Sequence, residues 1–153
     1  MELRARINAA VKQAMRDRAS ERLSTLRLIS AAFKDRDIAA RGEGREDGVD
    51  ETELLGILGK MVKQRRESAA SYEEAGRLDL AQQERDEIEV IEEFLPRPLD
   101  DDEVEAAIAA AMDEIGATSI RDMGRVMGLL KQRYTGRMDF AAAGPRVKDR
   151  LSA

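Results

Sequence analysis

Hydrophobic residues recur along most of this sequence at the three- and four-residue spacing of amphipathic α-helices. Leu3, Ile7 and Val11 form one such stripe, and Leu26 and Ile29 belong to a second. No run of alternating apolar and polar residues is long enough to predict a strand. The pattern predicts an all-α protein with an N-terminal four-helix part, an extended hinge and a C-terminal three-helix bundle.

Capping signals predict where several N-terminal helices begin and end. Ser20 is a candidate N-cap for the second helix, and Asp50 is one for a long third helix. Gly76 stands where a left-handed residue would end that third helix. Residues 41–48 contain three glycines and no hydrophobic residue, which is typical of an exposed loop.

The clearest boundary in the sequence lies at Pro96 and Pro98. Two prolines one residue apart do not fit a helix interior, and each favours an extended conformation in the residue before it. We therefore expect an N-terminal helical domain over residues 1–95, a linker over residues 96–98 and a C-terminal domain over residues 99–153.

The C-terminal part predicts three shorter helices. Gly116 ends the first of them, and Thr118 or Ser119 caps the second. The last helix contains Gly144-Pro145, so we expect it to be two pieces or to begin late.

The composition removes most catalytic chemistry. The chain has no Cys and no His, which excludes disulfides, thiolate nucleophiles, a Ser-His-Asp triad and the commonest transition-metal ligand. Aromatic residues supply only 3% of the chain, so the core must consist of aliphatic side chains and Met. No signal peptide and no apolar run of roughly 20 residues is present, so we expect a soluble, cytoplasmic protein. We expect neither a metal nor a cofactor.

The net charge of −5 conceals an uneven distribution of charged residues. Residues 1–41 carry ten basic and five acidic side chains, whereas residues 42–95 carry seven basic and sixteen acidic ones. Residues 96–119 carry one and seven, and residues 120–153 carry eight and three. Two basic ends therefore flank an acidic middle. Solvated helix faces would explain this arrangement, and a phosphate-binding C-terminal segment would explain its last part.

Three charged clusters have both a structural and a functional interpretation. The acidic residues 100–103 could bind a hard cation, but consecutive helix residues point in different directions, and capping of a helix explains them better. The glutamates within residues 87–93 could form acid/base pairs, but no partnering motif accompanies them, which favours a solvated face. The basic residues 60–66 could bind phosphates, although pairing with nearby acids is favoured.

The most distinctive segment contains Gly124 and Gly128, four residues apart on one side of a predicted helix. Each glycine costs about 1 kcal/mol relative to alanine in a helix. Close approach of a neighbouring helix would explain them, and so would close approach of a ligand backbone. Packing is favoured, so we expect Gly128→Leu to destabilise the bundle by roughly 1–3 kcal/mol through overpacking.

A tyrosine and three cations follow the glycine pair, namely Tyr134, Lys131, Arg133 and Arg137. Cations can contact phosphates, and a tyrosine beside them can stack on a base. This part of the chain is therefore a candidate nucleic-acid contact.

Three motifs in a fixed order carry a family resemblance. They are RLSTLR at residues 22–27, EEFLP at residues 92–96 and GATSIRDMGRVMG at residues 116–128. Together they resemble the GatB/YqeY family, over nearly the whole chain from about Leu3 to Leu151. The C-terminal part resembles the helical tail of the GatB component of the tRNA-dependent amidotransferase.

That enzyme amidates Glu-tRNA(Gln) or Asp-tRNA(Asn), with glutamine as the nitrogen donor, and the tail of its GatB component contacts the tRNA. The carbon–nitrogen ligase chemistry resides elsewhere in the enzyme. The resemblance therefore implies an RNA-contacting helical module that has no catalytic residues of its own. The tRNA-contacting residues that it implies are Met123, Gly124, Arg125, Gly128, Lys131, Arg133 and Arg137.

Two functions remain open from the sequence. The first is a non-catalytic tRNA-binding accessory module, whose partners would be tRNA and an aminoacyl-tRNA synthetase or amidotransferase subunit. The alternative is a helical protein-interaction module without RNA contact. An autonomous amide-forming enzyme is the least supported, because no activated nucleophile is found. The salt dependence of binding distinguishes the tRNA-binding module from the protein-interaction module, because counterion release weakens RNA binding as the salt concentration rises.

Limited proteolysis tests this layout. A protease of broad specificity should cut within residues 41–45 or at Arg97 before it cuts any helix, because these segments lack regular structure in the predicted arrangement. Mass spectrometry of the first fragments locates the cuts. A first cut inside residues 54–72 would contradict the layout.

Overall fold

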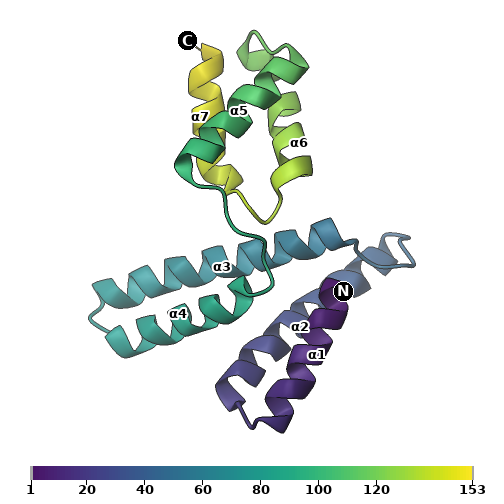
Figure 1. Cartoon of the computed structure of the whole chain (residues 1–153), viewed down its shortest axis with the longest axis vertical. Helices are drawn as coiled ribbons and strands as arrows, with labels where there is room; N and C mark the ends of the chain where they lie inside the picture. Colours follow the sequence, from purple (N-terminus) through teal and green to yellow (C-terminus); the bar gives the residue numbers. More distant parts are fainter. Residues whose placement is uncertain (1, 153) are drawn as a thin grey trace. The chain divides into compact units, whose positions relative to one another are not determined.

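The structure is a computed structural model that describes residues 2–152 (Figure 1). Within these residues it contains seven α-helices, one 3-10 helix and no strand, which confirms the all-α prediction. No helix of the described chain is long and apolar enough to cross a membrane. The helices in chain order are α1 (Leu3–Arg16), α2 (Ser20–Gly42), α3 (Glu51–Glu74), α4 (Leu78–Glu92), α5 (Asp101–Ile115), the 3-10 helix η1 (Ile120–Asp122), α6 (Met123–Tyr134) and α7 (Phe140–Ser152).

The chain divides into two compact units, Met1–Pro96 and Arg97–Ala153. The first unit contains α1 to α4, and the second contains α5, η1, α6 and α7. That these units are separate domains joined by a linker at residues 96–98 stays a prediction.

The first unit consists of two helical hairpins. Helix α1 packs along α2, α3 packs along α4, and α2 also contacts both α3 and α4 (Figure 1). Apart from Phe33, Met61 and Phe94, the buried cluster of this unit is aliphatic. The largest fully buried side chains of this unit are Ile7, Leu26, Ile29, Leu58 and Ile91.

An ion pair between Arg4 and Asp37 joins α1, α2 and the loop that leads into α3. The Arg4 guanidinium donates to both carboxylate oxygens of Asp37, at 2.6 and 2.8 Å, and to the carbonyl oxygen of Val49 at 3.0 Å. The Val49 amide donates to Asp37 Oδ1 at 3.1 Å. The hydrogen bonds from Arg4, with a further contribution from the Val49 amide, hold the pKa of Asp37 at about 2.

The second unit is a three-helix arrangement in which α6 packs against both α5 and α7. Its core residues Ile108, Val126, Leu130 and Val147 have no exposed surface. A second buried cluster, distinct from that of the first unit, therefore holds these helices together.

The acidic start of α5 is a helix cap, as predicted. Asp100 Oδ1 accepts the Glu103 amide at 2.8 Å, and Glu103 Oε1 accepts the Asp100 amide at 3.2 Å, which is a capping box. Arg97 donates to both carboxylate oxygens of Glu103 at 2.8 Å and lowers the pKa of Glu103 to about 2. Gly116 ends the helix in the left-handed conformation, with φ of 70°.

Two predicted caps in the first unit are confirmed and one is wrong. Asp50 Oδ1 accepts the Glu53 amide at 2.9 Å, and Gly76 has a φ of 75°. Ser20, in contrast, is the first residue of α2 and makes no capping hydrogen bond, since Ala19 occupies the N-cap position. Only three residues separate α1 from α2, and backbone hydrogen bonds hold this turn together with one from the Gln13 side chain to Asp17 Oδ1 at 2.9 Å.

The predicted break in the last helix is also wrong. Helix α7 is continuous, with Pro145 inside it. Proline removes the hydrogen bond to the carbonyl of Ala141, but both residues are exposed, so water can bond to that carbonyl. Gly144 is buried beside Met123, whose Cε would lie 3.9 Å from an added Cβ.

The Arg4–Asp37 ion pair predicts a pH dependence of stability. Because the pKa of Asp37 is lowered in the folded protein, its contribution is complete above pH 3.8 and is lost as pH falls through about 2. The shift corresponds to about 2 kcal/mol. Asp37→Asn should lower the free energy of unfolding by about that amount at neutral pH and flatten its decline below pH 4.

Urea unfolding at several pH values measures this effect. The matched control is Asp35→Asn, which changes an exposed carboxylate two residues away. Equal losses in the two variants would contradict the role assigned to Asp37.

Candidate nucleic-acid interface

The start of α6 is fixed by the carboxylate of Asp122. Its Oδ2 accepts the amides of Thr118 at 2.9 Å and Ser119 at 3.2 Å, and these hydrogen bonds lower the pKa of Asp122. Ser119 Oγ accepts the Arg121 amide at 3.3 Å, so Ser119 is a cap, as predicted. The capped turn is η1, and α6 follows it directly, so the cap sets the direction of the helix.

One side of α6 belongs to the core of the second unit. Val126 and Leu130 are fully buried, and Met123 is partly buried against the same cluster. Met123 is therefore a packing residue in this structure, and the helix presents a different side to solvent.

The two glycines of α6 lie on the exposed side. Both Gly124 and Gly128 are exposed, and a Cβ added to either would have no other atom within 4 Å. The prediction that they allow close helix packing is therefore wrong, because α5 and α7 contact other sides of α6. The expected overpacking by Gly128→Leu loses its basis for the same reason.

Three cations accompany these glycines on exposed positions. Arg125 is 63% exposed and donates to Asp122 at 3.1 Å within its own turn. Lys131 and Arg121 are exposed, and no ion pair is found for either among residues 2–152. We call this surface the glycine face, and its members are Arg121, Gly124, Arg125, Gly128 and Lys131.

Arg133 and Arg137, the other two predicted contact residues, have partners within the unit. Arg133 forms an ion pair with Glu114 of α5. The Arg137 Nε donates to the Arg97 carbonyl at 2.9 Å, while the Arg137 carbonyl accepts the Leu99 amide at the same distance. The backbone and side chain of Arg137 therefore hold the start of this unit against the turn after α6.

Folding neutralises much of the basic C-terminal segment. Residues 97–153 carry nine basic and ten acidic side chains in total. Arg146 pairs with Asp101 at 3.0 Å, and Arg150 pairs with Glu105 at 2.8 Å, so the arginines of α7 face the acids of α5. The glycine face keeps its cations because no element of the described unit supplies acids to Arg121 or Lys131.

Arg121 is a member of the glycine face that the sequence motifs did not single out. It precedes Arg125 by four residues, a spacing that places helical residues on one side. That spacing was a usable signal, but the 3-10 turn at residues 120–122 could not be anticipated from it.

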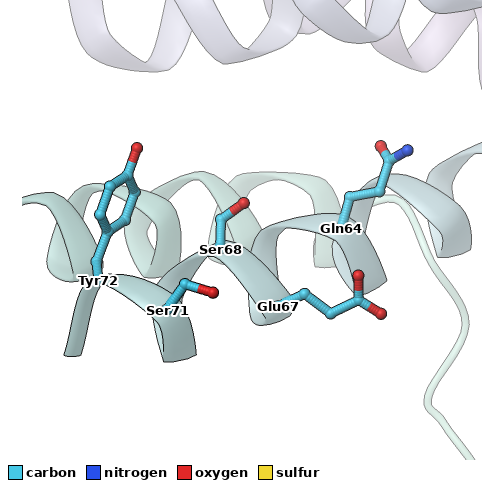
Figure 2. Close-up of a pocket in the computed structure, with 5 residues that line it drawn as sticks. All are labelled: Gln64, Glu67, Ser68, Ser71 and Tyr72. Carbon is cyan, nitrogen blue, oxygen red and sulfur yellow. The ribbon is translucent and has the colours of Figure 1, made fainter. Parts of the chain in front are cut away.

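A pocket lies elsewhere, on the surface of α3 in the first unit. Figure 2 shows that Gln64, Ser68 and Tyr72 extend from one side of the helix, with Glu67 and Ser71 on an adjacent side. All five side chains come from one helix, and none of them is cationic. The pocket offers three hydroxyl groups, one amide and one carboxylate.

The other charged clusters act within the first unit. Arg65 pairs with Glu87 at 2.9 Å, which agrees with the intramolecular pairing favoured for residues 60–66. Glu93 pairs with Arg22. Among residues 2–152, no group of three or more acidic side chains is placed to hold a metal ion.

Comparison with known proteins places the chain in a family. A family model described as Yqey-like protein matches residues 4–151. The chain therefore belongs to the Yqey-like protein family, which confirms the resemblance of its three motifs.

Curated relatives carry the name "Altered inheritance of mitochondria protein 41, mitochondrial". The protein from Clavispora lusitaniae is 32% identical over 109 residues, which cover 70% of this chain and 61% of the relative. The protein from Vanderwaltozyma polyspora is 32% identical over 85 residues, covering 56% and 44%. The chain thus spans about half the length of the curated relatives that it matches.

The open space above the glycines predicts a gain in stability on substitution. Gly124→Ala and Gly128→Ala should each raise the free energy of unfolding of the second unit by about 1 kcal/mol, because alanine has the higher helix propensity and meets no neighbour. Thermal unfolding followed by circular dichroism measures the change. A fall in melting temperature in either variant would show that the face is covered.

Proposed function

We propose that this chain is a non-catalytic tRNA-binding accessory module that contacts tRNA phosphates through the glycine face. The observation that carries the proposal is the pair of exposed glycines, Gly124 and Gly128, beside Arg125, which pairs only within its own turn, and beside Arg121 and Lys131, for which no ion pair is found among residues 2–152. Bare glycine backbone allows a ligand chain to approach a helix more closely than any side chain would. Arg121, Arg125 and Lys131 supply the positive charge that a phosphate requires.

The motifs support this assignment. The glycine face lies within the C-terminal part of the chain, which resembles the tRNA-contacting tail of the amidotransferase. Its cations number only three, so few counterions are released, and both the affinity and its dependence on salt should be modest. Carbon–nitrogen ligase activity would belong to a partner, such as an amidotransferase subunit, with glutamine as nitrogen donor.

The organisation of the chain fits the same proposal. We propose that residues 1–95 and 99–153 are two domains, four helices followed by three, of which the second contacts RNA. The cytoplasmic location stays a prediction, since the curated relatives carry a mitochondrial label in their names.

Filter binding with total tRNA at two salt concentrations tests the proposal. Replacing Arg121, Arg125 and Lys131 together by Glu should weaken binding to all tRNA species and reduce the slope against log salt by about one for each cation removed. Arg137 is left unchanged, because its side chain holds the start of the unit. Circular dichroism should show that this variant keeps the helix content of the wild-type protein.

The matched control changes the same amount of charge in the first unit, at Lys12, Arg16 and Lys60, all exposed. It should leave tRNA binding near the wild-type value. Gly128→Leu should weaken binding without lowering stability, since it blocks backbone approach on an uncovered face. Absence of tRNA retention by the wild-type protein at low salt would overturn the proposal.

A further inference from the structure

The outward side of α2, in the first unit, has a regular pattern that the proposed RNA contact does not use. Six residues alternate at spacings of four and three along the helix, and every one of them is exposed. They are Ser24, Leu28, Ala31, Asp35, Ile38 and Gly42. We call this row the α2 seam.

The spacing of the α2 seam is that of the contact positions in a coiled coil. Leu28 is 44% exposed and Ile38 is 55% exposed, so two large apolar side chains face solvent about three helical turns apart. Ser24, Ala31 and Gly42 are small, and an added Cβ on Gly42 would meet nothing within 4 Å. The seam therefore offers two apolar anchors, with Ala31 and the exposed carboxylate of Asp35 between them and small residues at both ends.

A row of cations follows one flank of the seam. Arg27, Lys34 and Arg41 are seven residues apart, and all three are exposed. No ion pair is found for Arg27 or Lys34 among residues 2–152. Arg41 interacts electrostatically with Asp37, which Arg4 already pairs. The flank has therefore kept its positive charge in a protein with a net charge of −5.

The opposite flank of the α2 seam carries no charged residue, and this argues against a second copy of α2 as the partner. Its residues are Thr25, Ala32 and Ala39. A second copy of α2 in antiparallel orientation would place cation rows against each other, and a parallel copy would place cations against these uncharged residues. Neither arrangement pairs the charges, so the surface disfavours self-association.

We propose that the α2 seam docks an amphipathic helix of a partner protein that carries acidic side chains at seven-residue spacing. Its apolar side chains contact Leu28 and Ile38, and its acids pair with Arg27 and Lys34. An anionic membrane fits less well, because half of the seam is small residues and it contains no aromatic side chain. This site lies in the first unit and is independent of the glycine face.

A designed peptide probes the site in the full-length chain. The probe is a fluorescent helical peptide of about three heptads with Leu and Ile along its seam and Glu on the flanks, and its twin has Lys in place of Glu. Fluorescence anisotropy should show binding of the Glu peptide and on the order of tenfold weaker binding of the Lys peptide. Arg27→Glu with Lys34→Glu should reverse this preference.

Apolar and charged contacts are then separated by exposed substitutions. Leu28→Ser with Ile38→Ser should reduce Glu-peptide affinity on the order of tenfold, whereas Leu78→Ser, at another exposed leucine, should not. Lys12→Glu with Lys60→Glu should leave the preference for Glu unchanged.

Three results would overturn the proposal. One is equal affinity for the two peptides, and another is a loss of binding in the Lys12/Lys60 control as large as that in the Arg27/Lys34 variant. The third is seam-dependent binding to vesicles of equal parts phosphatidylcholine and phosphatidylserine without peptide binding. tRNA binding by the glycine face should be unchanged in the Leu28/Ile38 variant, so failure here is distinguishable from failure of the proposed function.

Discussion

Each helix of this protein buries one narrow aliphatic side, and this constraint governs the rest of the structure. With aromatic residues at 3% of the chain and charged residues at 37%, the two cores consist mainly of Leu, Ile, Val, Met and Ala, with Phe33 and Phe94 in the first, while charge covers the outside. The pocket on α3 is formed by one helix alone. On their outward sides, α2 and α6 each present an ordered arrangement of small residues and cations.

Folding pairs many of the basic side chains of the C-terminal segment with acidic ones, so the charge counted along the sequence differs from the charge left on the surface. The C-terminal segment is basic when residues 120–153 are counted alone, but α5 supplies acids to Arg133, Arg146 and Arg150. The remaining positive charge forms a small surface around Gly124 and Gly128. A positive surface of this size fits the proposed contact with a few phosphates. Binding to nucleic acid through a large positive field would require more cations on one side.

Several local features of the fold could be predicted from the sequence, although the Ser20 cap and the break at Gly144-Pro145 were wrong, and non-local features could not be predicted. The caps at Asp50 and Asp100 and the left-handed Gly116 depend on residues within one turn, so sequence spacing sufficed. Whether a neighbour covers Gly124 and Gly128 depends on where α5 and α7 pack, which spacing does not specify. The same limit applies to Arg137, because its side chain donates a hydrogen bond to the carbonyl of Arg97, forty residues earlier in the chain. The predicted site thus divides into an exposed part, a packed Met123 and two arginines with partners in their own unit.

Gly48 couples the residues that can be tolerated at positions 4, 37 and 48, which lie in α1, α2 and the loop before α3. Its φ is +80°, and a Cβ there would lie 2.5 Å from Asp37 Oδ1, inside the ion pair with Arg4. Any other residue at position 48 must shift that carboxylate, which weakens its ion pair with the guanidinium of Arg4. Over evolutionary time, substitutions at these three sites should therefore be epistatic: a change at position 48 costs less after the ion pair has been lost, although the positive φ still disfavours residues other than glycine.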